Sequence, residues 1–141
     1  MGVTMTRTFE NLGTGLRKQF SELTTRLTHD MEKAIQVGAE SVQHVVDTSG
    51  TTKSGKAGRI IKGDMRKEVD SKVTQASSTM VEGEYGWLEQ TPFYATLQDA
   101  GFRHWISGEL VEGMFALQQS SDVAWAEFNR LADVSVKVVF G

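Results

Sequence analysis

The 141-residue sequence contains no cysteine, so disulfide bonds and metal or iron–sulfur sites built on thiolates are excluded. No stretch approaches the roughly 18 consecutive apolar residues that a membrane-spanning helix requires, and the first residues, MGVTMTRTFENLG, lack the apolar core of a secretory signal. Charged residues make up 23% and hydrophobic residues 39% of the chain, proportions typical of a folded, water-soluble protein. We therefore expect a single domain spanning residues 1–141, without a membrane partner.

The residues that enzymes use for chemistry are present but scattered. His29, His44 and His104 are isolated, with no second histidine three or four residues away to complete a metal-binding pair. Glu82 and Glu84 would share one face of a strand, where an exposed polar edge explains them more simply than acid–base catalysis. The sequence therefore predicts a protein that is not an enzyme and that holds no cofactor or metal ion.

Apolar residues recur every three or four positions between residues 7 and 47, which predicts a long helix. Two early glycines weaken its first turns, so we expect the firm helix to begin near Leu16 and residues 1–15 to form a flexible arm. A helix of some thirty residues is about 45 Å long, and its apolar stripe needs a neighbour. A coiled-coil partner is one possibility. The small residues Ala34, Gly38 and Ala39 suit packing against a sheet or another subunit.

A glycine-rich segment, residues 48–63, follows the helix and is expected to be a flexible basic loop. Residues 50–57, GTTKSGKA, match a phosphate-binding loop except at Ala57, which lacks the hydroxyl that would bind magnesium. Residues 53–67 carry six cations against one acid, a net charge of +5, whereas nine acids against three cations give −6 from Glu82 to the end. Such segregation suits head-to-tail contacts between copies, although both regions could simply be solvated faces.

Two alternating segments, residues 69–75 and 79–88, predict an antiparallel hairpin with a short turn at Ser77–Ser78. Helical spacing returns from Leu110 to Ala132. The last residues, VSVKV at 134–138, alternate instead, and the sequence leaves helix and strand open for residues 133–141. Together these elements define an α+β fold with a long N-terminal helix, a flexible basic loop, a small antiparallel sheet and a C-terminal helix.

The segment from Glu84 to Gln119 holds both tyrosines and two of the three tryptophans, and it is interrupted by four glycines and the only proline. So much aromatic area in a glycine-broken segment indicates either a folded core or a surface that awaits a partner. We expect the large aromatic residues of this half, as common anchors of interfaces, to supply core and subunit contacts. These residues are Tyr85, Trp87, Phe93, Tyr94, Phe102 and Trp105.

Read together, these features resemble a family of phage tail components typified by gene product 10 of phage HK97. The order matches over about residues 30–130: a helix, a Gly/Lys/Arg loop with the sequence SGKAGRIIKGDM, a hairpin, and a helix opened by the apolar stretch from Ile106 to Leu117. Between the hairpin and the last helix lies a Tyr-x-x-x-x-acid-x-Gly element formed by Tyr94, Asp99 and Gly101.

The resemblance implies a structural virion protein that joins the head connector to the tail tube as a tail-completion, head-closure or tail-terminator component. It also implies a homo-oligomeric, hexameric ring, assembled in the host cytoplasm, through whose lumen DNA passes without sequence-specific binding. We expect the basic loop to contact protein rather than DNA, through Lys53, Lys56, Arg59, Lys62 and Arg66. The alternative is a small dimeric nucleic-acid-binding or regulatory module that uses residues 53–67 to neutralise phosphates.

Overall fold

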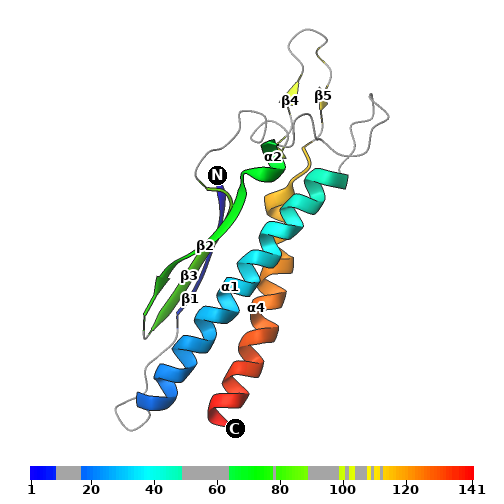
Figure 1. Ribbon diagram of the computed structural model, residues 1–141. Coiled ribbons are helices and arrows are strands. Elements are labelled where there is room, and N and C mark those ends of the chain that lie inside the picture. The colour runs from blue at the N-terminus through cyan, green and yellow to red at the C-terminus, as the bar shows by residue number, and fades with distance from the viewer. Residues whose placement is uncertain are drawn as a thin grey trace.

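The computed structural model describes residues 1–8, 17–48, 64–77, 79–88, 99–100, 102–103, 108, 110–111 and 113–141. Its architecture is an α+β fold in which a pair of long helices covers one face of a small antiparallel sheet (Figure 1). The helices are α1 (Arg17–Thr48), the single turn α2 (Asp64–Lys67) and α4 (Ala116–Phe140). The strands are β1 (Gly2–Thr8), β2 (Val69–Ala76), β3 (Met80–Trp87), β4 (Phe102–Arg103) and β5 (Leu110–Val111).

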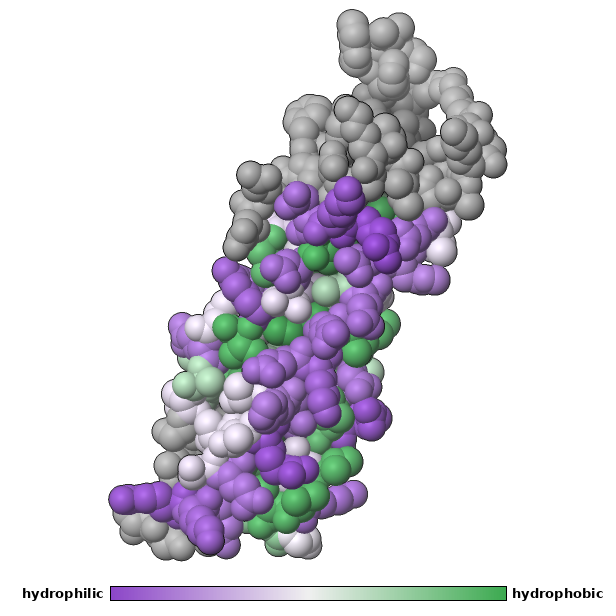
Figure 2. All heavy atoms as spheres, in the orientation of Figure 1, coloured by the Kyte–Doolittle hydropathy of each residue, from purple (hydrophilic) through white to green (hydrophobic). Residues whose placement is uncertain are grey.

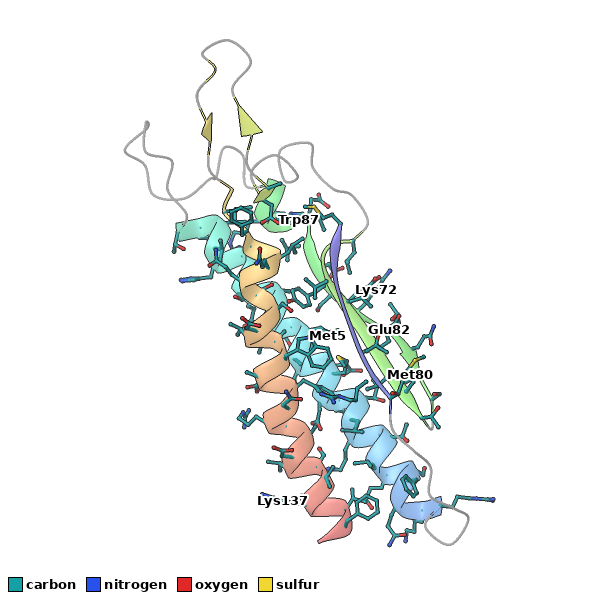
Figure 3. All side chains as sticks on the ribbon, turned by 180° about the vertical axis from the view of Figure 1, so that it is seen from behind. Met5, Lys72, Met80, Glu82, Trp87 and Lys137 are labelled. Carbon is teal, nitrogen blue, oxygen red and sulfur yellow. The ribbon has the colours of Figure 1, made fainter. Side chains whose placement is uncertain are left out.

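The three-stranded sheet has the order β1-β3-β2, so the predicted hairpin forms its central and one edge strand. Both pairings are antiparallel, with Val3 opposite Tyr85 and Val69 opposite Trp87. Its inner face is apolar, whereas the outer face carries threonines and carboxylates. Figure 3 shows Met5 on the side of the helices, with Lys72 and Glu82 on the other.

Helices α1 and α4 run antiparallel, and the apolar stripe of α1 is divided between α4 and the sheet (Figure 1). Near the middle of the helix pair, the buried Ser135 hydroxyl donates a hydrogen bond to Asp30 Oδ2 at 2.5 Å. Near its end, the rings of Phe20 and Phe140 meet edge to face at 5.8 Å. The neighbour that the long helix requires is therefore supplied by the chain itself.

Of the small residues expected to pack against a sheet or another subunit, Gly38 packs against the sheet. Ala34, Gly38 and Ala39 are buried, and a Cβ added to Gly38 would lie 2.6 Å from the ring of Tyr85. Glycine thus lets the α1 backbone approach β3 at a distance that no other residue permits. Tyr85 fixes this contact, because its hydroxyl lies 2.9 Å from Ser120 Oγ of α4.

Three expectations from the sequence need correction or resolution. Residues 2–8, expected within a flexible arm at residues 1–15, form β1 and pair with β3 over their whole length. Leu110–Val111, expected in the last helix, are the strand β5, and α4 begins at Ala116. Residues 134–140, left open between helix and strand, are helical. The expected loop at 49–63 lies outside the described residues.

The start of α4 is held by a residue of the Tyr-x-x-x-x-acid-x-Gly element. Asp99 accepts the backbone N–H of Phe115 through its carbonyl at 3.0 Å and that of Ala116 through its carboxylate Oδ1 at 2.5 Å. The carboxylate therefore caps one orphan donor of the helix, the Ala116 N–H, although it lies 17 residues earlier in the chain. Phe115, which precedes the helix, has the left-handed φ of 50° and is exposed.

Candidate assembly interface

The β1 strand pairs with β3 along one edge, and no strand of the described residues pairs with its other edge. Met1 and Trp87 are hydrogen-bonded to each other, with Trp87 N–H donating to the Met1 carbonyl at 3.1 Å. Because antiparallel ladders alternate, residues 3, 5 and 7 also turn their N–H and C=O groups toward β3. The even-numbered residues therefore turn theirs outward. These residues, Gly2, Thr4, Thr6 and Thr8, define the β1 edge.

None of the residues described by the structure supplies a backbone hydrogen bond to the β1 edge. The edge has no bulge in its register with β3 and carries no charged side chain among its four residues. Natural sheets usually protect such edges with charges, bulges or proline, because an open row of N–H and C=O groups can pair with another strand.

The opposite edge of the same sheet is protected. By the same alternation, Ser71 of β2 faces outward, but its N–H donates to the Asp70 carboxylate at 2.8 Å and is not free for a partner. The pairing of β2 with β3 shifts between Val73 and Gln75, so Thr74 forms a bulge. The two edges of one sheet therefore differ in their capacity to accept a further strand.

The surroundings of the β1 edge are acidic. On the outer face of the sheet, Glu82 accepts a hydrogen bond from Thr6 Oγ1 at 3.0 Å. The α4 side contributes exposed Asp122 and Asp133, which lie seven residues before and four residues after Asn129 and so share its face of the helix. Asn129 in turn bonds to Arg7 of β1.

Arg7, the only charged side chain of β1, is held away from the open edge. Its guanidinium lies 5.3 Å from the ring centre of Trp125 and 5.7 Å from that of Phe128, and Nη2 donates to Asn129 Oδ1 at 2.9 Å. Cation–π contacts and a hydrogen bond thus fix this cation against α4.

A second exposed surface lies on another side of α4. Val123, Val134 and Val138 are 45%, 50% and 55% exposed, and their spacing of 11 and 4 residues places them on one face, defined here as the valine surface. Val134 is five residues from Asn129, so this face is turned roughly 140° around the helix from the β1 side. In Figure 2, hydrophobic residues emerge beside the hydrophilic face of α1, toward the end where the C-terminal part of α4 lies.

Charged residues interrupt the valine surface. Arg130 Nη2 lies 2.5 Å from Glu127 Oε1, and this hydrogen bond and ion pair lower the pKa of the Glu127 carboxyl from its ordinary value. Both side chains lie between Val123 and Val134 in sequence. The surface therefore combines apolar contact area with a charge pair, as subunit interfaces commonly do.

The structure places the predicted contact residues in different settings. Tyr85 and Trp87 are fully buried in the core, where they fill the core role expected of them; that they also contact a neighbouring subunit stays a prediction. Burial raises the pKa of the Tyr85 hydroxyl, an effect that its hydrogen bond with Ser120 partly offsets. Arg66 forms an ion pair with Asp47 at 3.0 Å and is therefore engaged within its own chain.

The side chains of the remaining predicted contact residues lie outside the described part of the structure. Phe102 belongs to β4, whose side chains are not described. The others, Lys53, Lys56, Arg59, Lys62, Phe93, Tyr94 and Trp105, lie outside the described residues. Sequence reasoning missed both the β1 edge and the valine surface. The alternation of Val3 and Met5 with threonines was the available signal for the first.

Within the described ranges, no cluster of three or more histidine or acidic side chains could hold a metal ion, and no helix is long and apolar enough to cross a membrane. No protein-family model, no curated protein and no solved structure matches the chain.

Proposed function

We propose that this chain is a structural subunit of the neck or tail terminus of a tailed phage, where copies form a ring, hexameric by the resemblance, between head connector and tail tube. The order of a long helix, a hairpin and a C-terminal helix supports this proposal, because it agrees with the order in the phage tail-component family. In this role the protein performs no catalysis. It contributes shape, subunit contacts and a passage for DNA.

The observation that carries the proposal is the presence of two separate exposed surfaces on the described part of the molecule. The β1 edge turns outward backbone groups that no described residue pairs with, and the valine surface offers apolar area on a different side of α4. Two unlike surfaces allow each copy to contact more than one neighbour, and head-to-tail contacts close into a ring when the rotation between neighbours is suitable. A single self-complementary surface would instead produce a dimer.

Mass photometry and cryo-EM of the purified protein, alone and mixed with the tail-tube and connector proteins of the same phage, test the proposal. A hexamer of the 15.6 kDa chain has six times that mass, about 94 kDa. The substitutions Val134→Glu and Val138→Glu should reduce ring formation, whereas Gln36→Glu, on the exposed face of α1, should not. A monomer that never associates with itself or with either partner would refute the proposal.

A duplex-DNA titration at two salt concentrations tests the alternative of a nucleic-acid-binding module. Sub-micromolar binding that weakens steeply with salt would favour that alternative. Of residues 53–67, which this alternative would use, Arg66 is paired with Asp47, and residues 53–63 lie outside the described residues.

A further inference from the structure

We propose that the β1 edge is a docking site for an extended basic segment donated by a second copy of this chain, and that the donated segment is residues 53–63. The inference rests on the proposed function, since it names one of the contacts by which neighbouring subunits would join. In the docked state, the segment would become a fourth strand of the sheet, next to Gly2, Thr4, Thr6 and Thr8.

The first argument is the contrast between the two edges of the sheet. The four residues of the β1 edge present their N–H and C=O groups outward at about 6.6 Å intervals, which is the repeat of a strand. Strand addition uses such groups for affinity and the alternate side chains for specificity. The β2 edge does not compete, because Asp70 occupies the Ser71 N–H and the bulge at Thr74 interrupts the row.

The second argument concerns the shape of the occupant. Helix α4 lies beside β1 on the inner face (Figure 3). There Arg7 joins the strand to Trp125 and Asn129. A partner that added its own β1 would have to bring its own α4 alongside, because Arg7 ties that helix to the strand. A bare extended segment has no helix above it and fits. The occupant is therefore a single donated strand, rather than the sheet of another copy.

Charge complementarity favours a basic occupant of the β1 edge. Glu82 beside Thr6 and the exposed Asp122 and Asp133 on the α4 side make the surroundings of the edge acidic. The one cation of the strand, Arg7, is held by α4. A basic segment therefore gains favourable long-range attraction on approach, and its binding should weaken as salt is added.

Composition identifies residues 53–63 as the donated segment. Of the three longest stretches outside the described residues, residues 9–16 contain Glu10, and residues 89–98 contain Glu89 and Pro92. Residues 49–63 contain no acid. Their basic part, 53–63, combines four cations with Ile60–Ile61, a β-branched pair that favours an extended conformation. Its charge and strand propensity match what the β1 edge requires.

Disulfide trapping between two single-cysteine variants tests the contact in the intact protein, and the cysteine-free sequence provides a clean background. Thr6→Cys and Ile60→Cys chains are mixed at the concentration where assembly occurs and are then oxidised. We expect a crosslinked heterodimer. As a control, Ser71→Cys chains, with the cysteine on the protected β2 edge, are mixed with Ile60→Cys chains and should give little crosslinking. A chain carrying both Thr6→Cys and Ile60→Cys that crosslinks only within itself would overturn donation by a second copy.

A second measurement removes a single edge N–H. Thr4→Pro deletes a donor that faces away from β3, so the existing ladder keeps its bonds, and Thr4→Val keeps the donor as a control. A fluorescent peptide of residues 53–63 should bind the Thr4→Val control as it binds wild type, and bind Thr4→Pro about tenfold more weakly. Equal binding to both variants, with circular dichroism confirming their folds, would overturn the docking site.

The outcomes separate this inference from the proposed function. Rings that form without the Thr6–Ile60 crosslink, and in which the Thr4 and Thr6 amides exchange freely with solvent, would refute the docking site but leave the neck role standing. Crosslinking and peptide binding without any association with tail-tube or connector proteins would support the docking site and refute the neck role.

Discussion

We predict that replacing Gly38 by alanine destabilises the protein, whereas helix propensity alone predicts that it stabilises it. In an exposed helix, alanine is more stable than glycine by about 1 kcal/mol. At this position the new Cβ would lie 2.6 Å from Cε1 and Cζ of Tyr85. The ring cannot move away easily, because it is fully buried and its hydroxyl is hydrogen-bonded to Ser120. Overpacking of this kind costs about 1–3 kcal/mol.

The net expectation for Gly38→Ala is a loss of stability of about 1–2 kcal/mol, since the anchored ring places the cost in the upper part of that range. The midpoint of thermal unfolding should fall by roughly 3–8 °C. Urea denaturation followed by circular dichroism and tryptophan fluorescence measures the change. Comparison of Gln36→Ala with Gln36→Gly, at an exposed position of α1, gives the propensity term separately.

The double variant Gly38→Ala with Tyr85→Leu identifies the clash. Without the ring, the added methyl group should be tolerated, so the cost of Gly38→Ala should shrink or change sign. The difference in free energy of unfolding between Gln36→Ala and Gln36→Gly is the gain from helix propensity alone. If Gly38→Ala stabilises the wild-type protein by that same amount, the close approach of α1 to β3 is wrong.

Single contacts elsewhere in the chain give three further predictions. Asp99→Ala should cost about 1 kcal/mol in urea denaturation, because the start of α4 loses its carboxylate cap, whereas Asp99→Asn should retain most of it; equal losses would contradict capping. Phe115→Gly should raise the thermal midpoint slightly or leave it unchanged, since the left-handed backbone costs about 1–2 kcal/mol, and Phe115→Val should lower it; the reverse order would contradict the strain. Burial raises the pKa of Tyr85 above its unfolded value of 10.0, so the unfolded chain loses its proton first as pH rises. Stability should therefore fall from about pH 10 upward, and Tyr85→Phe should flatten that slope in denaturation curves.

The elements that the sequence predicts well are those specified locally. The apolar stripe of α1 repeats at helical spacing for more than thirty residues, and the structure has a helix at Arg17–Thr48. The hairpin alternates and turns within twenty residues, and β2 and β3 are found where the alternation places them. In both cases the residues that decide the conformation are close together in the sequence.

β1 is specified by contacts that no local pattern reveals. Val3 and Met5 face the core, but the next inward position holds Arg7, which makes the segment read as polar. Its guanidinium is accommodated because Trp125 and Asn129 meet it from a helix more than a hundred residues later. The end of α4 is similar. VSVKV alternates like a strand, yet Ser135 bonds to Asp30 of α1, and the segment continues as helix.

The division of aromatic residues between core and surface also depends on tertiary contacts. Tyr85 and Trp87 belong to a segment whose composition suits a core and an interface equally well. What decides is the glycine opposite Tyr85 on α1, since it allows the helix to cover β3 completely. A sequence can supply both partners of this contact without showing that they meet.

The difference between the two sheet edges limits how far strand pairing can proceed. If both edges were open, copies could add β1 to β2 without end, and the product would be a fibre rather than a ring. The Asp70 bond to Ser71 and the bulge at Thr74 prevent that reaction at β2. In the proposed docking, the β1 edge receives only a segment tethered between Thr48 and Asp64 of another chain, and each copy has one such segment. Every subunit then donates once and accepts once, and such head-to-tail contacts close into a ring when the rotation between neighbours is suitable.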